Sequence, residues 1–175
     1  DRNFRLNVLK ITRNNGQDTL QDLNYYYDAV GNIVGEADHA QQIFYFANQE
    51  VEPVFNYTYD PLYRLLTATG REMTALQMLT HEDFPNNIPC PNPGPDAMQN
   101  YTQHYQYDAL GNMLQMQSQN RWTRDYIYDT ATNRLLRHTQ QLPDTYSYDT
   151  HGNMLTMPHL SNMSWDYLDQ LHSAS

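Results

Sequence analysis

Six aspartates recur along the chain, each directly after an aromatic residue, and carboxylates in this number could bind calcium or hydrolyse glycosidic bonds. Hydrolysis needs two carboxylates about 5–10 Å apart across a sugar ring. Calcium loops need several oxygen ligands within about twelve residues, and the sequence has no such run. Each aspartate is therefore predicted to serve its own turn rather than a shared site. The six are Asp28, Asp60, Asp108, Asp129, Asp149 and Asp166.

Tyrosines are the second group that could do chemistry, because aromatic faces can stack on sugar rings, and the chain has 15 of them. Many stand in pairs at positions i and i+2 just before a motif aspartate. Side chains so spaced point to the same side of a strand. The spacing favours aromatic ladders between neighbouring repeats over a carbohydrate platform, with the hydroxyls in water or bonded to adjacent backbone. The pairs are Tyr25 and Tyr27, Tyr57 and Tyr59, Tyr105 and Tyr107, Tyr126 and Tyr128, and Tyr146 and Tyr148.

The remaining reactive residues show no catalytic or metal-binding pattern. The seven histidines lack a His-Glu-x-x-His spacing, and pairing of His151 with His159 as metal ligands is left open without support. No nucleophile elbow, P-loop or dinucleotide fingerprint occurs. The single cysteine, Cys90, excludes an internal disulfide and a cysteine-cluster metal site. We therefore predict no enzymatic activity, no cofactor and no metal.

The aspartates and tyrosines belong to one repeat, Tyr-x-Tyr-Asp-x-x-Gly-Asn followed by an apolar residue. Two tyrosines open a strand, and the aspartate ends it by accepting backbone N–H bonds. Glycine three residues later takes a positive φ at little cost, as a tight reversal needs. The unit is thus predicted to be a β-hairpin, repeated six times. The glycines are Gly31, Gly111 and Gly152; Tyr63 replaces one, and the last copy carries Trp165 and Asp166.

The repeats predict an all-β fold, with about twelve to fourteen antiparallel strands in one curved sheet. Apolar side chains should line one face, and Gln, Asn and Thr the other. We expect residues 1–175 to be one segment, with an additional strand over 41–48. A Pro-rich insertion at about 72–100 should interrupt it as an irregular loop, preceded by a short helix at Met73, Leu76 and Leu79.

Composition excludes two classes of partner. The net charge is -10 over 175 residues, which repels phosphate backbones, so a nucleic-acid partner is not expected. No run of about 18 apolar residues occurs, so we predict no membrane insertion. A signal peptide is not expected at Asp1, because no charged and apolar leader pattern follows it.

The repeat resembles the tyrosine-aspartate repeats of the rearrangement-hot-spot (RHS) family, and flanking stretches are similar to the B component of bacterial ABC insecticidal toxin complexes. The resemblance implies a β-sheet that spirals into a hollow shell around a toxic polypeptide, within a secreted toxin complex. Its implied partners are the rest of the shell and the enclosed polypeptide. The similar stretches include Phe4-Arg5-Leu6, Thr19 to Leu23, Asp38 to Phe44, Tyr57 to Glu72, His151 to Leu160 and Asp169-Gln170-Leu171.

Two departures from that family limit what the resemblance implies. The Asp-Pro-x-Gly region that releases the cargo is absent from this sequence, and so is the β-propeller that docks on a translocation pore. Autoproteolysis and toxicity are therefore not carried over to these residues. A second hypothesis, from another class, is an extracellular carbohydrate-binding or adhesion module that uses exposed tyrosines.

Overall fold

The computed structural model describes residues 3–73, 98–139, 143–158 and 160–175. Within these ranges the chain forms sixteen strands and one short 3-10 helix, η1 (Asn14–Gly16). In the described ranges, eleven pairs of neighbouring strands are antiparallel with a defined register. The all-β prediction is confirmed.

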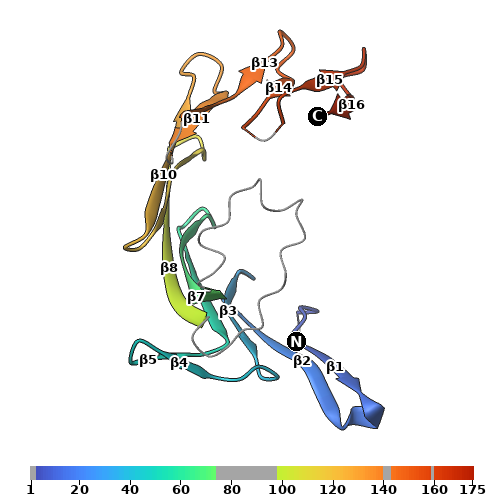
Figure 1. Cartoon of the computed structure of the whole chain (residues 1–175), viewed down its shortest axis with the longest axis vertical. Helices are drawn as coiled ribbons and strands as arrows, with labels where there is room; N and C mark the ends of the chain where they lie inside the picture. The colour runs from blue at the N-terminus through green and yellow to red at the C-terminus, as the bar shows by residue number, and fades with distance from the viewer. Residues whose placement is uncertain (1–2, 74–97, 140–142, 159) are drawn as a thin grey trace. The chain divides into compact units, whose positions relative to one another are not determined.

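The first compact unit, Asp1–His104, is built on neighbouring strands of one sheet. Its strand order is β1-β2-β3-β6-β7-β8, and Figure 1 shows β1, β2 and β3 side by side at the blue end of the chain. β4 and β5 form a separate hairpin. The strands are β1 (Val8–Arg13), β2 (Asp18–Tyr27), β3 (Ile33–Asp38), β4 (Phe44–Phe46), β5 (Gln49–Val51), β6 (Val54–Tyr59), β7 (Leu65–Met73) and β8 (Met98–Tyr107).

The second unit, Tyr105–Ser175, begins with the last residues of β8, which join β9 there. The sheet continues in the order β9-β10-β11-β12, and two hairpins follow, β13 with β14 and β15 with β16. The strands are β9 (Met113–Ser118), β10 (Trp122–Tyr128), β11 (Leu135–Thr139), β12 (Pro143–Thr145), β13 (Ser147–Tyr148), β14 (Met154–Thr156), β15 (Met163–Trp165) and β16 (Leu171–Ala174).

The prediction of twelve to fourteen strands in a single sheet is wrong, both in the number of strands and because the strands form more than one sheet. The described residues hold sixteen strands, and three pairs form two-stranded sheets of their own. The fifth repeat shows one reason. Tyr146 donates its N–H to Leu136 and lies outside both β12 and β13, so the predicted single strand is divided there. The strand expected over 41–48 is the short β4, whose partner is β5.

Few apolar side chains are buried. Among the described residues, Ala37, Val51, Ala68 and Met163 are buried hydrophobic residues, and Val51 is fully buried. Ser118 and His138 are buried polar residues. Half-buried and exposed side chains alternate along the strands. A sheet that is not packed on both faces leaves its aromatic side chains partly exposed to solvent. In β6, for example, Phe55, Tyr57 and Tyr59 are half-buried, whereas Asn56 and Thr58 between them are exposed.

The predicted insertion falls mostly outside the described residues. β7 runs to Met73 and β8 starts at Met98, so both strands extend slightly into the range expected to be a loop. Residues 74–97, with Cys90, His81 and most of the expected helix, are not described. Within the described ranges, nothing helical has the length and hydropathy for a bilayer crossing. The organisation of 1–175 as one segment stays a prediction.

Candidate functional site

The aspartate of each repeat organises the reversal that follows it. Asp28 accepts backbone N–H bonds at Oδ1 from Val30, Gly31 and Asn32, at 2.7 to 3.0 Å. Its own N–H donates to the carbonyl of Asn32 at 3.0 Å, which closes the loop. These bonds and the positive φ of Gly31 make a tight reversal that ends in a bulge. The register indeed shifts between Tyr26 and Tyr27.

The other repeats use the same bonds. The residue four positions after the aspartate donates its N–H to that carboxylate in four further copies, at 2.8 to 3.0 Å: Arg64 to Asp60, Asn112 to Asp108, Asn153 to Asp149 and Gln170 to Asp166. In the fourth copy the loop is one residue longer, so Ala131 and Thr132 donate to Asp129 instead.

These bonds keep the carboxylates ionised. Bonds from the Asn112 side chain and backbone hold the pKa of Asp108 below its ordinary value of about 3.8, despite some burial. Bonds from Arg64 lower the pKa of Asp60 in the same way, beginning with its backbone N–H. Burial opposes ionisation of Asp28, but the donors of Asn32, Gly31 and Val30 outweigh it and lower the pKa. Every one of these carboxylates is thus committed to its own turn.

The third position after the aspartate adopts a left-handed backbone whether or not it is glycine. Gly31, Gly111 and Gly152 have φ of 114°, 94° and 104°. Residues of other types take φ of 58° to 65° in the remaining copies: Tyr63, Asn133 (one place later in its longer loop) and Asp169. The reversal therefore survives where the sequence lacks the glycine.

We expect Gly111→Val to destabilise the second unit by about 1–3 kcal/mol, several times more than Gln115→Ala. A Cβ at Gly111 would meet no atom within 4 Å, so the cost comes from the backbone alone. Gly111→Asn should be tolerated, because Asn133 holds the equivalent place at φ 58°. Urea unfolding of the three variants checks this, and equal midpoints for Val and Asn would contradict the turn assignment.

The second aromatic residue of a repeat bonds to the backbone of the repeat before it. Tyr59 donates its hydroxyl to the carbonyl of Ile33 at 2.7 Å. Ile33 is the first residue of β3, and Met113, Leu135 and Met154 are likewise the first residues of β9, β11 and β14, whereas Leu6 lies two residues before β1. The equivalent bonds are Tyr27 to Leu6 at 2.7 Å, Tyr128 to Met113 at 3.1 Å, Tyr148 to Leu135 at 2.9 Å and Trp165 Nε1 to Met154 at 2.7 Å.

These bonds predict a measurable difference between tyrosines. Tyr59→Phe should lower the stability of the first unit by about 1 kcal/mol, because the Ile33 carbonyl loses its donor. Tyr26→Phe is the matched control: Tyr26 lies between Tyr25 and Tyr27, is 55% exposed and should change stability little. Thermal unfolding compares the two, and equal losses would argue against the bond.

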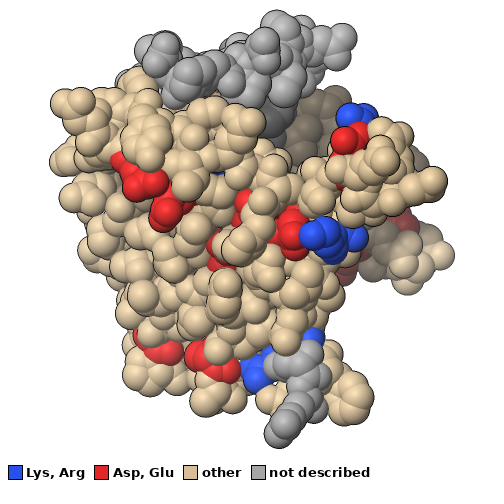
Figure 2. All heavy atoms as spheres, turned by 90° about the horizontal axis from the view of Figure 1, so that it is seen from below, with Lys and Arg blue, Asp and Glu red and all other residues tan. Residues whose placement is uncertain are grey.

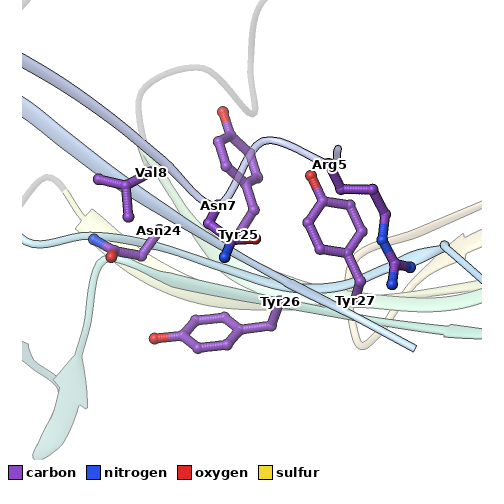
Figure 3. Close-up of a pocket in the computed structure, with 7 residues that line it drawn as sticks. All are labelled: Arg5, Asn7, Val8, Asn24, Tyr25, Tyr26 and Tyr27. Carbon is purple, nitrogen blue, oxygen red and sulfur yellow. The ribbon is translucent and has the colours of Figure 1, made fainter. Parts of the chain in front are cut away.

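Figure 3 shows how the strand separates its rings. Tyr25 and Tyr27 project from one side of β2, and Tyr26 projects from the other. Burial raises the pKa of Tyr25 and Tyr57, and the nearby Glu36 raises both further. Glu36 pairs with Tyr25 across β2 and β3 and with Phe55 across β3 and β6, so it lies on the tyrosine side.

In the second unit, a histidine ring lies between two tyrosine rings of neighbouring strands. His138 lies between Tyr126 and Tyr146, with ring centroids 6.0 and 5.9 Å away. Its Nδ1 is 2.9 Å from the Tyr146 hydroxyl. His138 is three residues after Leu135, as Glu36 is three after Ile33. Sequence reasoning missed this position, although its fixed offset from the repeat could have revealed it.

Arginines in the repeat also bridge to the next copy. Arg134 donates Nη1 to the carbonyl of Asp149 at 3.1 Å, and its guanidinium lies 5.5 Å from the Tyr148 ring centre. Arg5 repeats this on Asp28 at 3.1 Å and on Tyr27 at 4.9 Å. Figure 3 shows Arg5 beside Tyr27. The sequence analysis assigned no contact to these arginines.

A metal centre in the described ranges would need its potential ligands, His, Cys, Asp and Glu, to lie together in one place. No cluster of three or more potential metal ligands is found there. His151 bonds Asp169 at 3.0 Å at an exposed corner, and His159 is not described. On the face drawn in Figure 2, acidic side chains stand in small separate groups. The arrangement suits linking one hairpin to the next.

The sequence is similar to two toxin subunits of one organism. No protein-family model matches the chain. Toxin subunit YenC1 of Yersinia entomophaga is 34% identical over 124 residues, which is 68% of this chain and 12% of that protein. Toxin subunit YenC2 of the same organism is 34% identical over 140 residues, 74% of this chain and 14% of that protein. The chain therefore spans about an eighth of these relatives.

The solved structures that resemble this chain are also structures of toxin-complex components. The crystal structure of TcdB2-TccC3 aligns with a TM-score of 0.69 at 30% identity, over 95% of this chain and 8% of that one. The same pair with Cdc42 gives a TM-score of 0.70 at 30% identity and the same coverage. The Tc holotoxin pore of Photorhabdus luminescens gives 0.69 at 30% identity, again over 95% and 8%.

Proposed function

The chain belongs to the RHS-repeat proteins of insecticidal toxin complexes, and from this premise we propose that it forms part of the wall of a shell enclosing a polypeptide. In this role the chain is structural and does not catalyse a reaction. Containment and secretion with the complex are functions of the larger protein, of which this chain would supply one stretch.

The bonds from repeat to repeat are the observation that carries the proposal. The second aromatic ring of a repeat is bonded to a backbone carbonyl that precedes the repeat, as in Tyr59 to Ile33 and Tyr148 to Leu135. Every hairpin contains such a carbonyl, so the arrangement can be extended without a closed core. Few apolar side chains are buried in the described residues. A sheet of this kind separates two sides, which is what a wall requires.

The partners proposed are other subunits of a toxin complex and the enclosed polypeptide. TcdB2-TccC3 structures contain two such subunits together. The resemblance in the sequence suggested a B component, whereas the curated relatives are the subunits YenC1 and YenC2. We therefore propose a place in a subunit of the YenC1 and YenC2 kind, with the B component as the alternative.

The proposal is tested in a subunit of the relatives' length that contains this chain. We expect the enclosed polypeptide to resist an added protease in the parent protein. It should become digestible when Gly70→Val opens the wall, because Gly70 lies beneath the Phe55 ring. Gln115→Ala should leave the resistance unchanged. Equal digestion of the polypeptide with and without the shell would contradict containment.

Tryptophan fluorescence with added glycans distinguishes the shell proposal from the alternative that the chain is a carbohydrate-binding or adhesion module. Glycans added to the chain should leave the fluorescence of Trp122 and Trp165 unchanged if the tyrosines serve the repeat contacts. Trp165 already donates its indole N–H to Met154, so it is held by the sheet. Saturable quenching would favour a carbohydrate-binding module instead.

A further inference from the structure

We propose that His151 and Asp169 form a proton-sensitive link between the β13–β14 and β15–β16 hairpins, which is tighter when the imidazole is protonated. The two side chains lie in successive repeat turns, His151 two residues after Asp149 and Asp169 three residues after Asp166. The inference concerns only the contact between these two turns. It holds or fails whatever the sheet encloses.

The two hairpins depend on side chains for their connection. Each is a two-stranded sheet of its own, β13 with β14 and β15 with β16, at the red end of the chain in Figure 1. Trp165 of β15 donates its indole N–H to the carbonyl of Met154 in β14 at 2.7 Å. The turns supply further bonds between the hairpins. A change at the turns therefore acts on a junction between two separate sheets.

Two groups meet one carboxylate oxygen where the turns touch. Asp169 Oδ1 is 3.0 Å from His151 Nδ1, and it accepts the side-chain N–H of Asn153 at 2.7 Å. Asn153 also donates to Asp149 Oδ2 at 3.0 Å, so it joins the carboxylates of both turns. The side chains of His151 and Asp169 are 67% and 50% exposed, which lets protons from solvent reach the pair.

The chain contains an uncharged version of the same contact. Asn112 donates its side-chain N–H to Asn133 Oδ1 at 2.7 Å, and Asn133 returns a bond at 3.3 Å. Asn112 is the fourth residue after its aspartate, as Asn153 is. Asn133 has a φ of 58°, as Asp169 does. Because two amides are enough to join successive turns, the carboxylate and the imidazole add a dependence on pH rather than the contact itself.

The acidic groups around His151 favour its protonated form. The bond to Asp169, the charge of Asp169 and then that of Asp149 raise the pKa of His151 above its ordinary value of about 6.5, despite some burial. Bonds from Asn153 and His151 lower the pKa of Asp169 below its ordinary value of about 3.8. The imidazolium and the carboxylate thus stabilise each other.

Two more charged groups lie in the adjoining turns. Arg134, in the turn before, donates Nη1 to the carbonyl of Asp149 at 3.1 Å. Asp166 lies in the turn of Asp169, whose N–H it accepts at its carbonyl at 3.1 Å. Histidine is the type of side chain whose charge changes between about pH 5 and 8. His151 is therefore the group at this contact that titrates in that range.

Both pKa directions place the strongest link at neutral to mildly acidic pH. Protonated His151 stabilises the contact fully below its unfolded pKa of about 6.5, and this contribution is lost as the pH rises through the raised value. Ionised Asp169 contributes above about pH 3.8, and its part is lost as the pH falls through the lowered value. At higher pH the contact keeps the Asn153 bond and an uncharged imidazole, so the hairpins are held less tightly.

Exchange of the Trp165 indole N–H with solvent measures the junction. This N–H bonds the Met154 carbonyl across the same two hairpins, so it exchanges when they separate. Its protection is expressed relative to free indole at the same pH, which removes the effect of pH on exchange itself. The original chain is compared at about pH 5.5 and about pH 8.5. Trp122, in β10, reports on the rest of the second unit.

Two variants separate the charge from the contact. Asp169→Asn makes an amide pair of the kind that Asn112 and Asn133 form. Asparagine also accepts the left-handed backbone at this position, as Asn133 does. His151→Gln keeps a polar side chain but removes the group that titrates.

We expect the protection of the Trp165 indole N–H in the original chain to be about two- to fivefold lower at the higher pH. It should be the same at both pH values in the two variants, and the pKa of His151 should fall toward its ordinary value in Asp169→Asn. Equal protection at both pH values in the original chain would overturn the proposal, as would a loss that persists in Asp169→Asn. A loss of the same size at Trp122 would also overturn it, because the change would then not arise at this contact.

Discussion

Replacing Gly70 by valine is expected to destabilise the first unit by about 3 kcal/mol, although valine is a good strand former. Gly70 is in β7, next to Ala68 on the tyrosine side, and pairs with Tyr101 of β8. A Cβ there would lie inside the Phe55 ring's van der Waals envelope, 2.8 Å from Cε1 and closer still to Cδ1, and 3.1 Å from Tyr101 Cε1. Both rings would have to move off the strand.

The neighbouring Thr69→Val is the matched control. Thr69 is in the same strand but on the opposite side, where Asn56 and Thr102 are its cross-strand partners. Its replacement should change stability by less than about 1 kcal/mol. Chemical unfolding of both variants measures the difference. Gly70→Val should also cost less in a Phe55→Ala background, and equal costs in the two backgrounds would contradict the packing.

Acid is expected to unfold the chain through its turn aspartates. The pKa values of Asp28, Asp60, Asp108, Asp129 and Asp149 are all held below about 3.8 by bonds within their turns. The unfolded chain therefore binds more protons than the folded one as the pH falls through this range. Their contribution to stability is fully present above pH 3.8 and is lost as the pH falls through the lowered values.

The melting temperature should accordingly stay nearly level between about pH 5 and 8 and fall steeply below about pH 3.8. Asp108→Asn should start from lower stability and lose less of it in acid. Asp18→Asn is the control, since Asp18 is an exposed partner of Arg13 outside the repeat turns. A melting temperature that is constant down to about pH 2 would contradict the role given to the carboxylates.

The repeat turns could be predicted because their chemistry is local. An aspartate can reach backbone N–H groups two to four residues later, and Asp28 bonds those of Val30, Gly31 and Asn32. The spacing of Tyr25 and Tyr27 likewise determines that both lie on one side of β2. Neither inference needs any knowledge of the neighbouring strand.

The sequence predicted that tyrosine hydroxyls could bond adjacent backbone, as Tyr59 does at Ile33. The partner of each contact could not be predicted, because it depends on the register between strands. Nothing in the sequence near Tyr148 shows that its hydroxyl meets Leu135, or that Arg134 returns to Asp149.

The expectation that the reversal needs a glycine at the third position after the aspartate was also too strict, since Tyr63, Asn133 and Asp169 have positive φ there. Asp60 accepts the N–H of Tyr63 at its carbonyl and those of Leu62 and Arg64 at its carboxylate. These bonds hold Tyr63 in a left-handed conformation that its side chain alone would disfavour. The break between β12 and β13 at Tyr146 also depends on strand pairing, because Tyr146 donates its N–H to the carbonyl of Leu136.

The most direct test of the repeat is amide exchange at the fourth position after each aspartate. These amides are Asn32, Arg64, Asn112, Asn153 and Gln170, each bonded to a carboxylate oxygen at 2.8 to 3.0 Å. We expect all five to exchange slowly at neutral pH and to lose protection together when the carboxylates are protonated. Rapid exchange at all five at neutral pH would contradict the account.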